Sequence, residues 1–184
     1  MSTREQIIEL TDTLIRDYGY NAISFYDIAQ KLKIKNASIH YHFPTKSDLG
    51  IALLERHTQR LRELTESAKA KDSKVKIKSF WSIYDAIHHE GRVCLVGSLA
   101  TDLKTIEPKM AKALKIFANE ILEWVTAMLK EGKENKTFTF PETPRTKALM
   151  IISNMLAAVQ LSRLTGDSDF QIIRETVLSG LLRK

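Results

Sequence analysis

The spacing of apolar residues predicts that helices begin almost at the first residue. Between residues 3 and 18, apolar side chains recur every three or four positions, as they do along one side of an α-helix. Gly19 follows as a natural helix stop. The stripe consists of Ile7, Ile8, Leu14, Ile15 and Tyr18. We therefore expect a first amphipathic helix over residues 3–18.

Two short helices separated by a three-residue turn are predicted next. Ser24 and Asp27 form the Ser-x-x-Asp pattern of a capping box, so a helix should begin at Ser24. The helical period breaks over residues 33–35, and Asn36 is a good cap for a second helix. The inward-facing positions are Ile28, Ala29, Leu32, Ile39 and Phe43. Two helices joined in this way form a helix-turn-helix.

A fourth helix should begin at Thr45, because Thr45 and Asp48 repeat the capping-box pattern. The segment from Lys69 to Lys78 then contains five lysines and one aspartate. We interpret this segment as a solvated connection and not as a second nucleic-acid site.

Two stripes rich in aromatic residues follow, and they are expected to face one another. The first stripe contains Ile77, Phe80, Trp81, Tyr84, Ile87 and His88. The second begins after Glu107-Pro108 and ends before Gly132, and it contains Leu114, Phe117, Ile121, Trp124, Val125 and Met128. Aromatic residues at helical spacing are usually core residues, so we expect most of them to be packed inside the protein.

The last third of the chain predicts a helix that needs partners on two sides. Thr143-Pro144 marks a helix start, and the segment from Leu149 is apolar around most of its circumference. After Gly166 to Asp169, a final amphipathic helix contains Phe170, Ile173, Val177, Leu178, Leu181 and Leu182. The last two helices of two chains could form a four-helix interface, or the apolar helix could be buried within a monomer. The fold class is all-α.

Composition indicates a soluble globular protein. The chain has 184 residues, a net charge of +6 and 43% hydrophobic residues, which argues against disorder. A single cysteine excludes an intrachain disulfide framework and suggests a reducing compartment. We find no apolar run near the roughly 18 residues of a membrane span, and no signal-peptide core. The expected location is therefore cytoplasmic, without a membrane partner.

Positive charge is concentrated on the predicted helix-turn-helix. Residues 31–46 contain four lysines and no acid, whereas residues 1–30 contain two arginines and five acids. Lysines and hydroxyl groups bind DNA phosphates, and short polar side chains read base edges in the major groove. The alternative is that these lysines form the solvated face of an ordinary helical hairpin.

The setting of this segment favours DNA binding, because the chain resembles the N-terminal domain of the TetR family of transcriptional regulators from about Arg4 to about His57. Three features carry the resemblance: a first amphipathic helix ending in Gly19-Tyr20, the segment from Ser24 to Ala29, and the segment from Ala37 to Leu49. The family pattern usually has glycine at Lys33 and tyrosine at His40, and these two departures bear on base preference.

The resemblance implies a DNA-binding domain over residues 1–48 and an effector-binding and dimerisation domain over residues 49–184, with about nine helices in all. Ser24 and Tyr26 would approach the DNA backbone or groove edge. The recognition helix and its flank would contact bases and phosphates through Lys35, Asn36, Ala37, Ser38, His40, Tyr41, His42 and Lys46.

The same resemblance implies a helical cavity for a small-molecule effector in the body. The candidate lining residues are Trp81, Tyr84, His88, Phe117, Ile121 and Trp124. The resulting expectation is a homodimeric repressor of a palindromic operator, joined through its last two helices and released by an effector. No cofactor is expected. No metal site is expected either, since His88 and His89 are adjacent on a helix and point apart.

Three other functions stay open at this point. In an enzyme, Cys94 or a pocket around His88 would do the chemistry, but no nucleophile, base and orienting residue stand at a recognisable spacing. The segment from Cys94 to Ala100 also resembles a motif from one branch of the TetR family. We interpret Cys94 as a small buried apolar residue and not as a redox sensor. The chain could instead be a helical DNA- or protein-binding module without ligand control, or a transcriptional activator.

Overall fold

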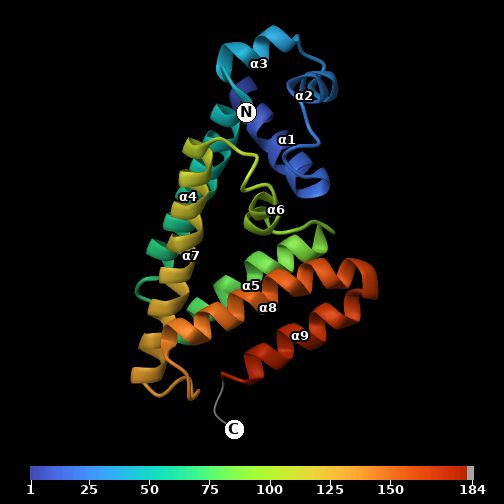
Figure 1. The fold of residues 1–184 in the computed structure, drawn as a ribbon. Helices are drawn as coiled ribbons and strands as arrows, with labels where there is room; N and C mark the ends of the chain where they lie inside the picture. The colour runs from blue at the N-terminus through green and yellow to red at the C-terminus, as the bar shows by residue number, and fades with distance from the viewer. Residues whose placement is uncertain (182–184) are drawn as a thin grey trace. The chain divides into compact units, whose positions relative to one another are not determined.

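The computed structural model describes residues 1–181, and over them the chain forms nine α-helices and no β-strand (Figure 1). The predicted all-α class is confirmed. Leu182, the last residue of the predicted final stripe, lies outside the described residues. The helices are α1 (Thr3–Tyr18), α2 (Phe25–Leu32), α3 (Asn36–His42), α4 (Lys46–Ala68), α5 (Ser73–His89), α6 (Leu95–Thr101), α7 (Pro108–Glu134), α8 (Pro144–Thr165) and α9 (Asp167–Ser179).

The chain divides into two compact units. The first contains Met1–Arg60 and Leu95–Ala118, and the second contains Leu61–Cys94 and the chain from Asn119 onward. Helices α4 and α7 therefore each begin in the first unit and end in the second. The predicted division after residue 48 is a division by role, and it stays a prediction.

In the first unit, the predicted capping boxes are present. The Ser24 hydroxyl accepts the Asp27 N–H, and the Asp27 carboxylate accepts the Ser24 N–H. Thr45 and Asp48 make the same pair of contacts before α4. The expected cap at Asn36 is wrong by one residue, because Lys35 is the N-cap of α3 and Asn36 is already helical.

Helix α6, which the apolar pattern did not predict, is fastened to the end of α1. Asp102 accepts hydrogen bonds from the Tyr20 N–H at 3.1 Å and from Asn21 Nδ2 at 2.9 Å. The Ser98 hydroxyl donates to the Ile15 carbonyl at 2.9 Å. The segment after residue 95 thus holds the turn that leads into the helix-turn-helix.

In the second unit, part of the predicted connection is a helix. Helix α5 begins at Ser73, so only residues 69–72 join α4 to α5. Lys76 is buried and its ammonium lies 2.5 Å from Glu131 Oε2 of α7. The interpretation of residues 69–78 as solvated was wrong there, because a partner more than fifty residues away neutralises this lysine.

The end of α7 also differs from the prediction. The helix continues through Gly132 to Glu134, where a stop before Gly132 was expected. A β-carbon on Gly132 would overlap the Phe138 ring, which is buried against this position. Glycine is needed here for the close approach of that ring and not as a helix stop.

We expect Gly132→Ala to lower the free energy of unfolding by about 1–3 kcal/mol, because the added methyl group overpacks a filled site. Urea denaturation of the purified protein measures this loss. Phe138→Leu in the same chain should recover part of it, since the two positions share one space. Unchanged stability of Gly132→Ala would contradict the packing described here.

Helix α8 is apolar but largely uncovered. It and α9 are joined at Gly166, so α9 begins at Asp167 and the expected spacer of residues 166–169 is shorter than predicted (Figure 1). Only 33% of the most apolar 18-residue stretch of α8 is buried. The helix has the length and hydropathy of a membrane span, which corrects the expectation, although core helices of soluble proteins pass the same test. It is also not a fully buried monomer helix, since Leu149, Met150, Leu161 and Leu164 are exposed.

Candidate DNA interface and effector site

A recess of about 430 Å³ beside α3 gathers four of the predicted DNA-binding residues. Its lining consists of Thr3, Ile34, Ala37, Ser38, Tyr41 and His42. The four residues from α3 come together because Ala37 and Tyr41 are four positions apart on one helix, as are Ser38 and His42. Thr3 and Ile34 were not predicted, and the only signal for Thr3 is its place on the first turn of α1.

The other predicted residues of the helix-turn-helix lie outside this recess. Ser24 is exposed, but its hydroxyl is occupied as the cap of α2. Tyr26 is exposed on the first turn of α2, and its hydroxyl accepts a hydrogen bond from Gln30 Nε2. Both side chains are exposed, and each hydroxyl group can still take part in a further hydrogen bond.

The recognition helix starts without neutralising groups. Its N-cap Lys35 makes no side-chain hydrogen bond to the helix, and the first turn contains no acid. The positive end of the helix dipole is therefore uncompensated there, which favours an approaching phosphate. Asn36 is exposed, and the exposed His40 ring packs edge-on against Phe25 at 4.8 Å.

Lys46 is held against an aromatic ring. Its ammonium lies 4.3 Å from the centroid of the Tyr20 ring, an attractive cation–π arrangement. Burial lowers the pKa of Lys46, partly offset by Asp102 and Asp27. Burial and three nearby acids raise the pKa of Tyr20 to about 12. A phosphate near Lys46 would favour its charged form, because opposite charges stabilise one another.

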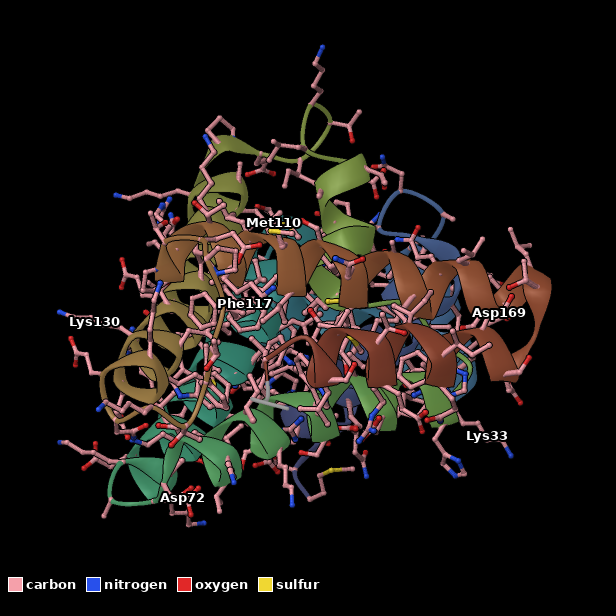
Figure 2. All side chains as sticks on the ribbon, turned by 90° about the horizontal axis from the view of Figure 1, so that it is seen from below. Lys33, Asp72, Met110, Phe117, Lys130 and Asp169 are labelled. Atoms are coloured by element: carbon pink, nitrogen blue, oxygen red, sulfur yellow. The ribbon has the colours of Figure 1, made fainter. Side chains whose placement is uncertain are left out.

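Lys33 adopts a backbone conformation that glycine favours. It ends α2 with φ 56° and ψ 39°, in the left-handed region, and its side chain is exposed (Figure 2). Non-glycine residues pay roughly 1–2 kcal/mol for this conformation. The chain therefore keeps a fourth cation on the helix-turn-helix at a conformational cost.

We expect Lys33→Gly to raise the free energy of unfolding by about 0.5–1 kcal/mol and to weaken DNA binding, since it relieves the backbone and removes a charge. Urea denaturation and DNA titration in increasing salt measure the two effects. Lys33→Asn tolerates the same backbone without the charge, so it should weaken DNA binding to the same extent. Lower stability of Lys33→Gly would contradict the strain argument.

The predicted effector residues are only partly brought together. In the second unit, the Phe80 ring lies 5.1 Å from Trp81, 5.3 Å from Tyr84 and 6.2 Å from Trp124, so these rings form one aromatic cluster. Ile121 is half-buried. Phe117 belongs to the first unit, where its ring lies 5.9 Å from that of His57.

Two polar groups of this set are notable. Trp81 is fully buried, and its Nε1–H has no hydrogen-bond partner within the described residues. Burial raises the pKa of the Tyr84 hydroxyl well above its ordinary value, with a smaller contribution from Cys94.

His88 lies apart from the cluster and stacks on Phe170 of α9, with ring centroids 4.0 Å apart. Among residues 1–181, no group of three or more His, Cys, Asp or Glu side chains is placed to hold a metal ion.

Comparisons with known proteins agree with these features. The family described as "Bacterial regulatory proteins, tetR family" matches residues 7–53, which include the whole helix-turn-helix. The chain is 23% identical over 162 residues to the HTH-type transcriptional repressor NemR of Escherichia coli K12, covering 85% of this chain and 81% of that protein. Two crystal structures of TetR-family regulators are similar along their whole length. One, from Agrobacterium tumefaciens, is 25% identical with a TM-score of 0.88, covering 98% of this chain and 97% of the other.

The other crystal structure, of a TetR transcriptional regulator from Legionella pneumophila, is 31% identical to this chain and has a TM-score of 0.85. The similarity covers 98% of both chains, so it includes the body as well as the helix-turn-helix. The resemblance first seen in residues 4–57 is therefore confirmed over nearly the whole chain: the protein belongs to the TetR family of helix-turn-helix DNA-binding transcriptional regulators.

Proposed function

We propose that this regulator is a homodimeric, cytoplasmic repressor that binds a palindromic operator and is released by a small-molecule effector. The observation that carries the proposal is the recess beside α3, where Ala37, Ser38, Tyr41 and His42 gather on the lysine-rich helix-turn-helix. Short polar side chains at this position can read base edges, while the surrounding lysines bind phosphates. The repressor activity named for the E. coli relative supports the direction of control.

The exposed apolar face of α8 supports the dimer. Leu149, Met150 and Leu161 are each nearly half exposed in one protomer, and Leu164 is 86% exposed. An isologous contact through α8 and α9 would cover this face in both protomers. It would also place two recognition helices on successive major-groove turns, which requires half-sites about 10 base pairs apart or a multiple of that spacing.

The aromatic cluster around Phe80 supports an effector site in the body. The buried Nε1–H of Trp81 lacks a partner, and a buried donor of this kind is normally satisfied. An apolar effector carrying one hydrogen-bond acceptor would satisfy it.

Helix α6 and the start of α7 belong to the same compact unit as the DNA-binding helices, and Asp102 bonds directly to the α1–α2 turn. A shift of α6 would therefore reach the helix-turn-helix. A coupling of about 1–3 kcal/mol would change DNA affinity roughly 5- to 150-fold.

Selection of bound DNA from a random pool tests this function, with and without candidate apolar effectors. We expect a two-fold symmetric consensus. Lys46→Ala should weaken binding to all sequences and flatten the salt dependence by about one phosphate contact, whereas Ser38→Ala should change the preferred base at one position of each half-site.

Lys130→Ala is the matched control for lost charge, since this exposed lysine lies near the end of α7 and outside the helix-turn-helix. It should leave the consensus and the affinity nearly unchanged. An asymmetric consensus, or Lys46 and Ser38 variants that bind like the parent protein, would contradict the proposed interface. Stronger DNA binding with effector would instead favour an activator or a co-repressed protein.

A further inference from the structure

We propose that Ala37 and Ile34 form an apolar contact for the 5-methyl group of a thymine in each half-site of the operator. The recess beside α3, which gathers four of the predicted DNA-binding residues, contains both of these apolar side chains. This contact rests on the proposed function, since it requires that the recess faces the major groove of DNA. It goes beyond that function by naming the base and the chemical group that is read.

The apolar side of the recess is open and held in position. Ala37 is exposed on the first turn of α3, and Ile34 is half-buried just before the N-cap Lys35. The Ile34 backbone N–H donates to the Ala29 carbonyl at 3.1 Å, which ties Ile34 to the end of α2. An apolar surface that is already fixed loses little conformational freedom on binding, so more of the contact energy is available to favour one base.

The lining of the recess favours a base edge over a phosphate group. The six lining residues include no lysine, arginine, aspartate or glutamate. The lysines of the helix-turn-helix lie outside this lining, and they are Lys31, Lys33, Lys35 and Lys46. Lysine and arginine neutralise DNA phosphates, whereas an uncharged recess suits the edge of a base pair. The recess measures about 430 Å³, so it can admit the edge of a base and not only a methyl group.

The position of Ala37 on the recognition helix selects thymine. Recognition helices of this motif enter the major groove with their N-terminal residues against the base edges. Ala37 is the second residue of α3, and its side chain has no polar atom that could form a hydrogen bond. Among the groups that base pairs present in the major groove, the thymine methyl group is the one that an apolar side chain contacts favourably. Ala37 beside Ile34 therefore favours thymine over cytosine, which lacks this methyl group.

Titration of the full chain with its selected symmetric DNA tests the contact, using duplexes in which deoxyuridine replaces single thymidines. Deoxyuridine pairs as thymidine does and lacks only the 5-methyl group. We expect one symmetric pair of thymidines at which the replacement weakens binding, by about 4-fold in one half-site and about 15-fold in both. These values follow because burial of one methyl or methylene group changes a binding constant by about 4-fold. Replacement of the other thymidines is the matched control, and it should leave the affinity nearly unchanged.

Ala37→Gly assigns the effect to this side chain. At the sensitive position, the ratio of the thymidine affinity to the deoxyuridine affinity should fall toward 1 in this variant. Glycine in a helix lowers stability, but both DNAs are titrated with the same protein, so a smaller folded fraction does not change the ratio. Lys46→Ala is the matched protein control. It should weaken binding to both DNAs and leave their ratio unchanged, because a phosphate contact does not distinguish bases.

A second pair of duplexes separates the methyl group from the other atoms of thymine. With a cytosine–guanine pair at the sensitive position, 5-methylcytosine should bind about 4-fold more tightly per half-site than cytosine, because only the methyl group differs. Equal binding of these two duplexes would overturn the contact.

Two further results would also overturn it. One is a symmetric consensus in which no thymidine is sensitive to deoxyuridine, and the other is a sensitivity that Ala37→Gly leaves undiminished. Both results would leave the proposed operator binding intact. The absence of a symmetric consensus would instead contradict the proposed function together with this contact, so the two failures are distinguishable.

Discussion

Leu161→Glu is expected to convert the proposed dimer into monomers and to lower operator affinity by roughly 100-fold or more. Leu161 is 46% exposed on the outer face of α8, beside other uncovered apolar side chains. In the proposed interface, each protomer would bury the new carboxylate in an apolar contact, which strongly disfavours association. Once the protomers separate, the second half-site is no longer bound at high effective concentration, and this linkage is commonly worth 10²- to 10⁴-fold.

Analytical ultracentrifugation gives the mass, and titration of the selected two-fold symmetric DNA gives the affinity. Ile116→Glu is the matched control, because Ile116 is also 46% exposed but lies on α7 in the first compact unit. It should stay dimeric. A Leu161→Glu protein that sediments as a dimer would rule out the α8–α9 interface. A monomer that binds DNA as tightly as the parent would rule out the need for two linked heads.

Local signals predicted the parts of the fold that depend on neighbours in sequence. The capping pairs Ser24–Asp27 and Thr45–Asp48 lie three residues apart, so their hydrogen bonds could be predicted before the fold was known. Lys76 and Gly132 could not be understood in this way. Lys76 is neutralised by Glu131, which tertiary packing brings beside it. Gly132 makes room for the Phe138 ring, which the turn after α7 brings back against the helix.

The same limit applies to the candidate sites. Ala37, Ser38, Tyr41 and His42 share one helix, so periodicity alone places them together, whereas Thr3 joins them only through the packing of α1 against α3. Phe117 and Trp124 share the stripe of α7, yet they belong to different compact units. A periodic stripe says that a face is buried, but not what buries each part of it.

Asp12→Ala is expected to lower the free energy of unfolding by about 3 kcal/mol, because it leaves buried cations without their anion. Asp12 is 6% exposed on α1, and its Oδ1 lies 2.9 Å from His57 Nε2 of α4. Its other oxygen lies 3.5 Å from the buried Arg16. Burial alone would raise the pKa of Asp12. The hydrogen bond from His57 and the charges of His57, Arg16 and Arg56 outweigh it, so the pKa is lowered.

The lowered pKa fixes the sign of the pH dependence. The ionised carboxylate contributes its full stability above the unfolded-state value near 3.8, and this contribution is lost as the pH falls through the lower folded-state value. The stability difference between parent and Asp12→Ala should therefore be large at neutral pH and shrink below pH 3.8. Urea denaturation of both proteins at neutral pH and below pH 3.8 measures this difference. Glu55→Ala, which removes an exposed acid of α4, should cost less than about 0.5 kcal/mol. Equal losses in the two variants, or a difference that persists undiminished in acid, would show that Asp12 does not anchor α1 to α4 electrostatically.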